Sequence, residues 1–246
     1  MDDDSKDELE TEFSDYFVGG IPPFLRFEIE YHSLFYLVES HKEDRWYPDA
    51  NPATQAALIS LVANFEAFCK HQFGALVNIH PELLRSFSAK RAQATIKLAD
   101  LVALFGHIED KVGFVVAEQY DFGSATLING LFRDLLDVTP FSKDEGEHFD
   151  QILLKRHLLV HHAGFYTLHF LKEKSLPHRI KQEAFRSAIK IGTEDYHQIG
   201  DFIFGMAMKV ARVTVKAVKR LFEADGRPHH TEALRECLRG LNDYLE

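Results

Sequence analysis

The chain has 246 residues, of which 46% are hydrophobic and 27% are charged, and its formal net charge is −10. This composition is ordinary for a globular protein and excludes a fibrous chain or one that is disordered throughout. The charge is uneven, because residues 1–150 hold 12 Lys/Arg and 27 Asp/Glu whereas residues 151–246 hold 16 and 11. The N-terminal part is therefore a poor non-specific binder of nucleic acid, while the basic C-terminal part leaves room for an anion site.

The sequence also gives an expectation about the compartment. It contains no uncharged apolar run of about 20 residues and no basic segment followed by an apolar core at its start, so neither a membrane span nor a signal peptide is expected. The two cysteines, Cys69 and Cys237, match no zinc or redox spacing. A chain of this size without a disulfide framework suits a reducing compartment, and we expect a cytoplasmic protein.

The sequence of the first half predicts a series of helices that follow an acidic N-terminal segment. Residues 1–14 are rich in Asp and Glu, which predicts a solvated, disordered tail. A single all-α domain is expected over residues 15–246. Apolar residues at three- and four-residue steps predict helices over about 23–43, 53–78, 81–87, 89–106 and 109–118. A strand over residues 108–116 is the one alternative to helix that the pattern allows.

The second half predicts four more helices and one less regular segment. Ser142 followed by Glu145 forms a capping-box pattern, which predicts a helix that starts there and runs to about His162. The longest helix is expected over residues 194–223, with acidic residues in its first turn and basic residues in its last. The remaining helices are expected over 124–137 and 230–245, with a helical or turn segment over 164–172.

The helix that ends near His162 carries an unusual arginine. On a helical wheel, one arc holds only apolar residues apart from Arg156: Phe149, Ile152, Leu153, Leu159 and Val160. A guanidinium is costly among apolar neighbours unless it is paired or faces a polar cleft. His157 and His161 lie four residues apart on one stripe, whereas His162 points to the solvent side. The wheel therefore selects His161 over His162 to share a site with Arg156.

Several structural arrangements remain open at this stage. Arg156 and His161 are about 140° apart on an ideal wheel, so they meet only under one of three conditions. The arginine side chain curls round, the helix loosens near Ala163–Gly164, or two copies of the helix face each other. Arg156 could instead form a buried structural ion pair. His157 and His161 could bind zinc, but no acidic residue stands where a His-Glu-x-x-His site needs one, so no metal or cofactor is expected.

The stretch RHLLVHHAG, residues 156–164, resembles the Arg-polar-x-x-x-His signature of the HEPN superfamily of helical ribonucleases and toxins. The resemblance extends over about residues 53–222 and implies a helical bundle of the HEPN type with additional helices. It places Glu66 where an acidic residue often stands in that family. The sequence departs from the commonest pattern in having His157 where Asn or Asp is frequent, and in doubling the motif histidine with His162.

The resemblance implies metal-independent cleavage of RNA by attack of a 2′-hydroxyl on the neighbouring phosphorus. Arg156 and His161 would be the catalytic pair, supported by His157, Glu66 and His162, and Lys155 would help to hold the RNA backbone. It also implies a homodimer in which two motif helices meet, and a toxin–antitoxin or defence setting with an antitoxin or other protein partner. The rival hypothesis is a non-catalytic module of the same fold that binds a protein or a nucleotide.

Overall fold

The protein is all-α in the part of the chain that its structure, a computed structural model, describes: residues 13–43, 51–91, 96, 99, 102, 108–173, 187–225 and 231–241. Two short 3-10 helices, η1 (Phe13–Tyr16) and η2 (Val18–Gly20), precede the α-helices. The α-helices are α1 (Pro23–Ser40), α2 (Pro52–Ile79), α3 (Leu83–Lys90), α5 (Ile108–Glu118), α6 (Ala125–Leu136), α7 (Lys143–His162), α8 (Leu168–Glu173), α10 (Thr193–Asp225) and α11 (Thr231–Glu236). Among these residues the sole β-type pairing is an isolated bridge between Phe165 and Ala188.

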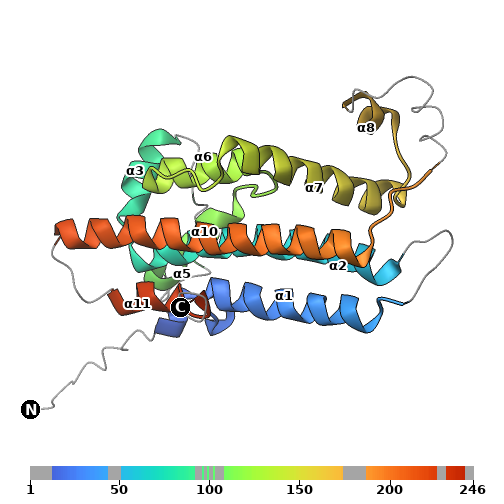
Figure 1. Cartoon of the computed structure of the whole chain (residues 1–246). Coiled ribbons are helices and arrows are strands. Elements are labelled where there is room, and N and C mark those ends of the chain that lie inside the picture. The colour runs from blue at the N-terminus through green and yellow to red at the C-terminus, as the bar shows by residue number, and fades with distance from the viewer. Residues whose placement is uncertain are drawn as a thin grey trace, which may run out of the picture.

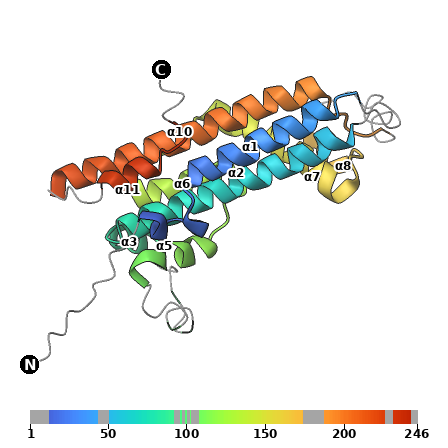
Figure 2. The same cartoon turned by 90° about the horizontal axis from the view of Figure 1, so that it is seen from below.

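Four long helices form the body of the molecule. The axes of α1, α2, α7 and α10 run nearly parallel, and α1 and α7 point in the opposite direction to α2 and α10 (Figure 1). The shorter helices α3, α5 and α11 gather at one end of this bundle, and α8 lies at the other end, to one side of the last turns of α7 (Figures 1 and 2). The bundle therefore brings the C-terminal turns of α7 to the end where α2 and α10 begin.

Most of the helices predicted from periodicity are confirmed. The helices predicted over 53–78 and 194–223 are α2 and α10, with ends shifted by one or two residues. Residues 108–118 form α5, so the strand alternative is wrong. Most of the helix predicted over 89–106 and residues 1–12 of the predicted tail lie outside the described residues. The prediction of a tail to residue 14 is wrong at its end, because Phe13 and Ser14 belong to η1.

Phenylalanine side chains make up much of the core. Phe65 of α2 is fully buried, and the ring of Phe149 on α7 lies 5.3 Å from its ring. The ring of Phe27 on α1 lies 6.2 Å away and that of Phe68 lies 6.1 Å away. These distances suit edge-to-face and tilted aromatic pairs. One aromatic cluster thus joins α1, α2 and α7.

Helices α2 and α5 approach each other at a pair of glycines. A Cβ added at Gly113 would collide with the carbonyl oxygen of Gly74 and lie 2.7 Å from Oδ1 of Asn78. The amide of Gly113 donates a hydrogen bond of 2.7 Å to that same Asn78 oxygen. The absence of side chains at these two positions is therefore what lets the two backbones meet.

We expect Gly113→Ala to lower the free energy of unfolding by about 1–3 kcal/mol, because α5 must move away from α2 to make room for the methyl group. Gly205→Ala is the matched control, since a Cβ at Gly205 of α10 has no atom within 4 Å. That change should be neutral or stabilise the helix by up to about 1 kcal/mol. Urea denaturation of both variants measures the difference, and equal stabilities would contradict the close approach.

Candidate functional site

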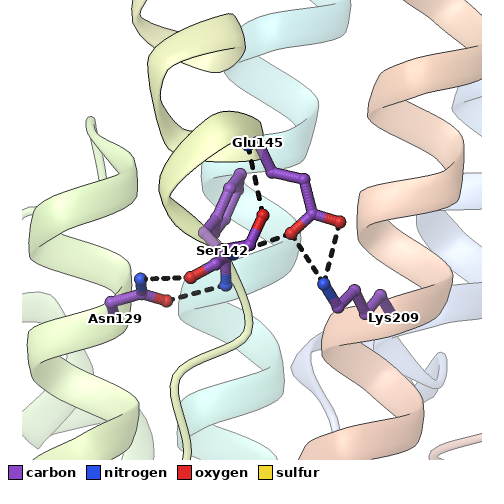
Figure 3. A network of polar contacts seen from close by, with 5 residues as sticks. Asn129, Ser142, Glu145 and Lys209 are labelled. Carbon is purple, nitrogen blue, oxygen red and sulfur yellow. Dashed lines mark hydrogen bonds and ion pairs between the residues drawn. The ribbon is translucent and has the colours of Figure 1, made fainter.

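The first turn of α7 is tied to two neighbouring helices. Ser142 caps it by accepting a hydrogen bond from the amide of Glu145, and the Glu145 carboxylate accepts one from the amide of Ser142. The ammonium of Lys209 on α10 donates to both oxygens of that carboxylate, at 2.8 and 2.6 Å (Figure 3). Asn129 of α6 exchanges two hydrogen bonds of 2.8 Å with the backbone of Phe141. The predicted capping box is confirmed, and its acidic member also anchors α7 to α10.

This anchor predicts a pH-dependent contribution to stability. Burial alone would raise the pKa of Glu145, but hydrogen bonds from Lys209 and Ser142 and the Lys209 charge outweigh it and lower the pKa below 4.5. A lowered folded-state pKa gives stability that is complete at neutral pH and is lost as the pH falls through that value.

Lys209→Met should therefore cost up to about 1 kcal/mol at pH 7, a small amount because both side chains are partly exposed. The difference from the wild type should shrink between about pH 5 and pH 3, where the carboxylate takes up its proton. Chemical denaturation across this pH range measures it. Lys216→Met, at an exposed position of the same helix, should show no such pH dependence.

The last turn of α7 ends in two residues with left-handed backbone conformation. Ala163 has φ of 49° and Gly164 has φ of 82°. The amide of Gly164 donates to the carbonyl of Leu158 at 2.9 Å, and the amide of Ile189 donates to the carbonyl of Gly164 at 2.8 Å. The helix thus ends where the sequence predicted, and the turn that ends it is fastened to the segment that leads into α10.

A pocket of about 790 Å³ opens along the middle of α7. Its lining comes from α7, α2 and the connection between α5 and α6: Glu66, Asp121, Gly123, Asp150, Gln151, Leu153, Leu154, Arg156 and His157. Asp150, Leu153, Leu154 and His157 are spaced i, i+3, i+4 and i+7, so they share one face of the helix. Its volume lies in the range of small-molecule sites.

The Arg156 guanidinium is the positive group of this pocket. The side chain is partly buried, and its Nε has no hydrogen-bond acceptor within the described part of the chain. Among those same residues it also takes part in no ion pair within 4.0 Å. Glu66 on α2 interacts with it electrostatically. The described structure therefore does not lock Arg156 in an internal ion pair.

Among the carboxyl groups that line the described pocket, that of Glu66 is the most buried. Burial raises its pKa, Arg156 opposes that rise, and the charge of Asp121 adds to it. The net rise shows that burial penalises the ionised form of Glu66 more than Arg156 stabilises it. Burial also raises the pKa of Asp150. The carboxyl groups of Glu66 and Asp150 thus take up protons more readily than ordinary ones.

His157, His161 and His162 form a cluster in the C-terminal part of α7. His157 lines the pocket with Arg156. The ring of His161 lies 4.7 Å from the ring of His157, and that of His162 lies 5.5 Å from it. Both are exposed, and neither is among the residues that line the pocket. Within one chain the structure thus brings His157 to Arg156, with His161 one turn further along.

The remaining predictions for α7 concern Lys155 and the apolar arc. Lys155 is partly buried and does not line the pocket. Phe149, Ile152 and Leu159 of the predicted apolar arc are buried, as expected. Val160, on the same apolar arc, is 43% exposed. It lies in the last turn of α7.

Asp121, Gly123, Asp150 and Gln151 are pocket residues that were not predicted. A signal for Asp150 was present, because it begins the i, i+3, i+4, i+7 spacing that ends at His157. Asp121 and Gly123 lie in the connection before α6, and the amide of Gly123 donates to Oδ1 of Asp121 at 2.8 Å. Nothing in the local sequence links that turn to α7, so only the tertiary structure reveals it.

No family model, curated protein or solved structure matches the chain. Among the described residues, no group of three or more His, Cys, Asp or Glu side chains is arranged to hold a metal ion. None of the described helices combines the length and the apolar character needed to cross a membrane. The described pocket offers guanidinium, imidazole and carboxyl groups for chemistry.

Proposed function

We propose that the protein is a metal-independent endoribonuclease of the HEPN type, with Arg156 and His161 as its active pair and His157 beside them. The observation that carries the proposal is the guanidinium of Arg156, which has no ion pair in the described structure and lines an open pocket with an imidazole. A second imidazole, that of His161, lies 4.7 Å from the first. The resemblance of residues 156–164 to the HEPN signature supports the same assignment.

Arg156 would stabilise the charge that develops on phosphorus. Its planar fork can donate to two non-bridging oxygens at once, which a lysine cannot do with the same geometry. Donors that are fixed before the reaction and shielded from water stabilise such charge more strongly than donors in solution. A guanidinium that forms no ion pair within 4.0 Å among the described residues is available for this task.

The histidines would move the two protons that the reaction requires. One imidazole accepts the proton of the 2′-hydroxyl as its oxygen attacks phosphorus, and the other donates a proton to the 5′-oxygen as the P–O5′ bond breaks. The products are a 2′,3′-cyclic phosphate and a free 5′-hydroxyl. An unperturbed imidazole has a pKa near 6.5, so both forms are present near neutral pH. His157 and His161 are the adjacent pair suited to these two roles.

A homodimer would complete the site, as the resemblance implies. Apolar side chains are exposed beside the histidines, at Val160 (43%), Phe165 (54%) and Leu168 (63%). A second copy placed against this end of α7 would bury them and bring its own His161 towards the first pocket. Light scattering of the purified protein should give twice the mass of the chain, and a monomer at all concentrations would contradict this part of the proposal.

The direct test is to incubate the pure protein with mixed RNA in an excess of chelator and to examine the product ends. We expect cleavage that persists in chelator, with cyclic phosphate at one end and 5′-hydroxyl at the other. Cleavage that stops in chelator would point to a metal-dependent hydrolase. The absence of cleavage would favour the rival function.

That rival is a non-catalytic module that binds a nucleotide or a protein. Three carboxylates in the lining favour it, those of Glu66, Asp121 and Asp150, because they repel a polyanion along part of the pocket. Binding of a mononucleotide or a basic peptide without turnover would support it. The variant His161→Ala distinguishes the two functions. It should abolish RNA cleavage but leave the binding of a nucleotide or a peptide largely intact.

We further propose that the activity belongs to a toxin or defence system, with an antitoxin or other protein as partner. The family resemblance is the support for this setting. Expression of the wild type should then arrest growth, and His161→Ala should relieve the arrest. Harmless expression of an RNA-cleaving wild type would argue against a toxin.

A further inference from the structure

The pocket lining changes in character along α7. Asp150 stands at one end, Leu153 and Leu154 follow, and Arg156 and His157 stand at the other end. Asp150 and His157 are seven positions apart in the helix, which is about 10 Å along the axis. Along α7, an acidic residue, an apolar stretch and a cationic end therefore follow one another over roughly the length of one nucleotide, and Glu66 of α2 interacts with the cationic end.

This order dictates how a nucleotide would lie. A phosphate is attracted to the guanidinium of Arg156 and repelled by the carboxylates of Asp121 and Asp150. The phosphate thus belongs at the Arg156 end, and the flat apolar face of a base can lie against the two leucines. The edge of that base then points to the carboxylates.

Asp121 has the features of a fixed acceptor. The amide of Gly123 donates to its Oδ1 at 2.8 Å, which holds the carboxylate in place and leaves Oδ2 and further lone pairs for a ligand. A Cβ at Gly123 would lie 2.9 Å from that same oxygen, so the turn suits a residue without a side chain. An ionised carboxylate only accepts hydrogen bonds, and it repels the lone pairs of a base.

Among the four RNA bases, guanine alone carries two adjacent N–H donors on its Watson–Crick edge, at N1 and N2. Adenine and cytosine place a donor beside an acceptor, and uracil has one donor between two carbonyl oxygens. We infer that the pocket selects guanosine next to the scissile phosphate, with Asp121 and Asp150 as acceptors for the N1 and N2 donors. This inference rests on the proposed ribonuclease function and names the nucleotide that its site recognises.

The inference is tested first on the RNA. Oligonucleotides that are identical except for one flanking nucleotide should be cleaved about tenfold faster with guanosine than with adenosine, the usual discrimination of a good two-donor contact. Inosine, which lacks the N2 amino group, should lose most of that advantage. The matched control is 7-deazaguanosine, which keeps the Watson–Crick edge and should be cleaved like guanosine.

The protein side is tested with Asp121→Asn, which keeps the shape and an acceptor for the Gly123 amide. The ratio of cleavage at guanosine to cleavage at adenosine should fall towards one in this variant. Asp144→Asn is the control, because Asp144 is exposed in the first turn of α7 and does not line the pocket. It should leave the ratio unchanged.

A binding measurement distinguishes the failure of this inference from the failure of the ribonuclease proposal. Oligonucleotides with a 2′-deoxy residue at the cleavage position cannot react, so their affinities report recognition alone. Guanosine-selective binding without cleavage of normal RNA would overturn the nuclease and retain the pocket preference. Cleavage with no preference, or with preference for another base, would overturn the guanosine inference and leave the nuclease standing. Neither cleavage nor selective binding would overturn both.

Discussion

Arg156→Ala is expected to lower kcat/KM for RNA cleavage by about 10²–10³-fold, the usual loss when one fixed donor to a developing charge is removed. The physical reason is that no other Arg and no Lys side chain lines the described pocket. The fold should survive, because Arg156 is in no ion pair of the described residues and its Nε has no acceptor to leave unsatisfied. Rates with a defined oligonucleotide in chelator, together with thermal unfolding of the variant, measure both effects.

Two further variants sharpen this prediction. Arg156→Lys keeps the charge but loses the planar fork, so it should recover part of the rate and not all of it. Arg212→Ala removes an exposed arginine from α10 and should leave the rate within about twofold, because surface changes far from a site seldom alter it. If Arg156→Ala unfolds the protein while Arg212→Ala does not, Arg156 has a structural role and the nuclease proposal fails.

The helices that the sequence predicted well are those whose signals are local. Ser142 and Glu145 define the start of α7 by their spacing alone, and the hydrogen bonds between them are present in the structure. The strand alternative over residues 108–116 was wrong, and the contact that this segment makes is not a local one. Helix α5 packs against α2 through Gly113 and Gly74, and that close contact depends on a segment more than 30 residues away. Local periodicity does not report such a contact.

The candidate site, too, was predicted from the sequence only in part. Arg156 stood out because a charge on an apolar arc needs a polar neighbour, and the structure places it in a pocket. Asp121 joins that pocket through the packing of the α5–α6 connection, which no spacing in the sequence reveals. The ideal wheel also selected His161 over His162 to share a site with Arg156, and the histidine that lines the described pocket is His157. A wheel orders side chains around one axis, but the pocket wall is set by α2 and by that connection.

Phe65→Ala is expected to lower the free energy of unfolding by about 3–5 kcal/mol, the usual cost of emptying a large aromatic site in a core. Phe65 is fully buried, and its ring contacts aromatic rings from both α1 and α7. The midpoint of thermal unfolding should fall by roughly 10 °C for a chain of this size. Tyr36→Ala is the control, because an aromatic ring is removed from a side chain of α1 that is 75% exposed. It should cost less than about 0.5 kcal/mol, as substitutions outside the core usually do.

The same substitution links the core to the pocket. Phe65 precedes Glu66 in α2, and its ring lies 5.3 Å from that of Phe149, which precedes Asp150 in α7. A cavity between these two rings removes the contact that sets the spacing of the two helices behind the pocket. We therefore expect RNA cleavage by Phe65→Ala to fall at temperatures well below its unfolding transition, with Phe65→Leu intermediate. Full activity of a folded Phe65→Ala protein would show that the position of α7 against α2 does not set the geometry of the reacting groups.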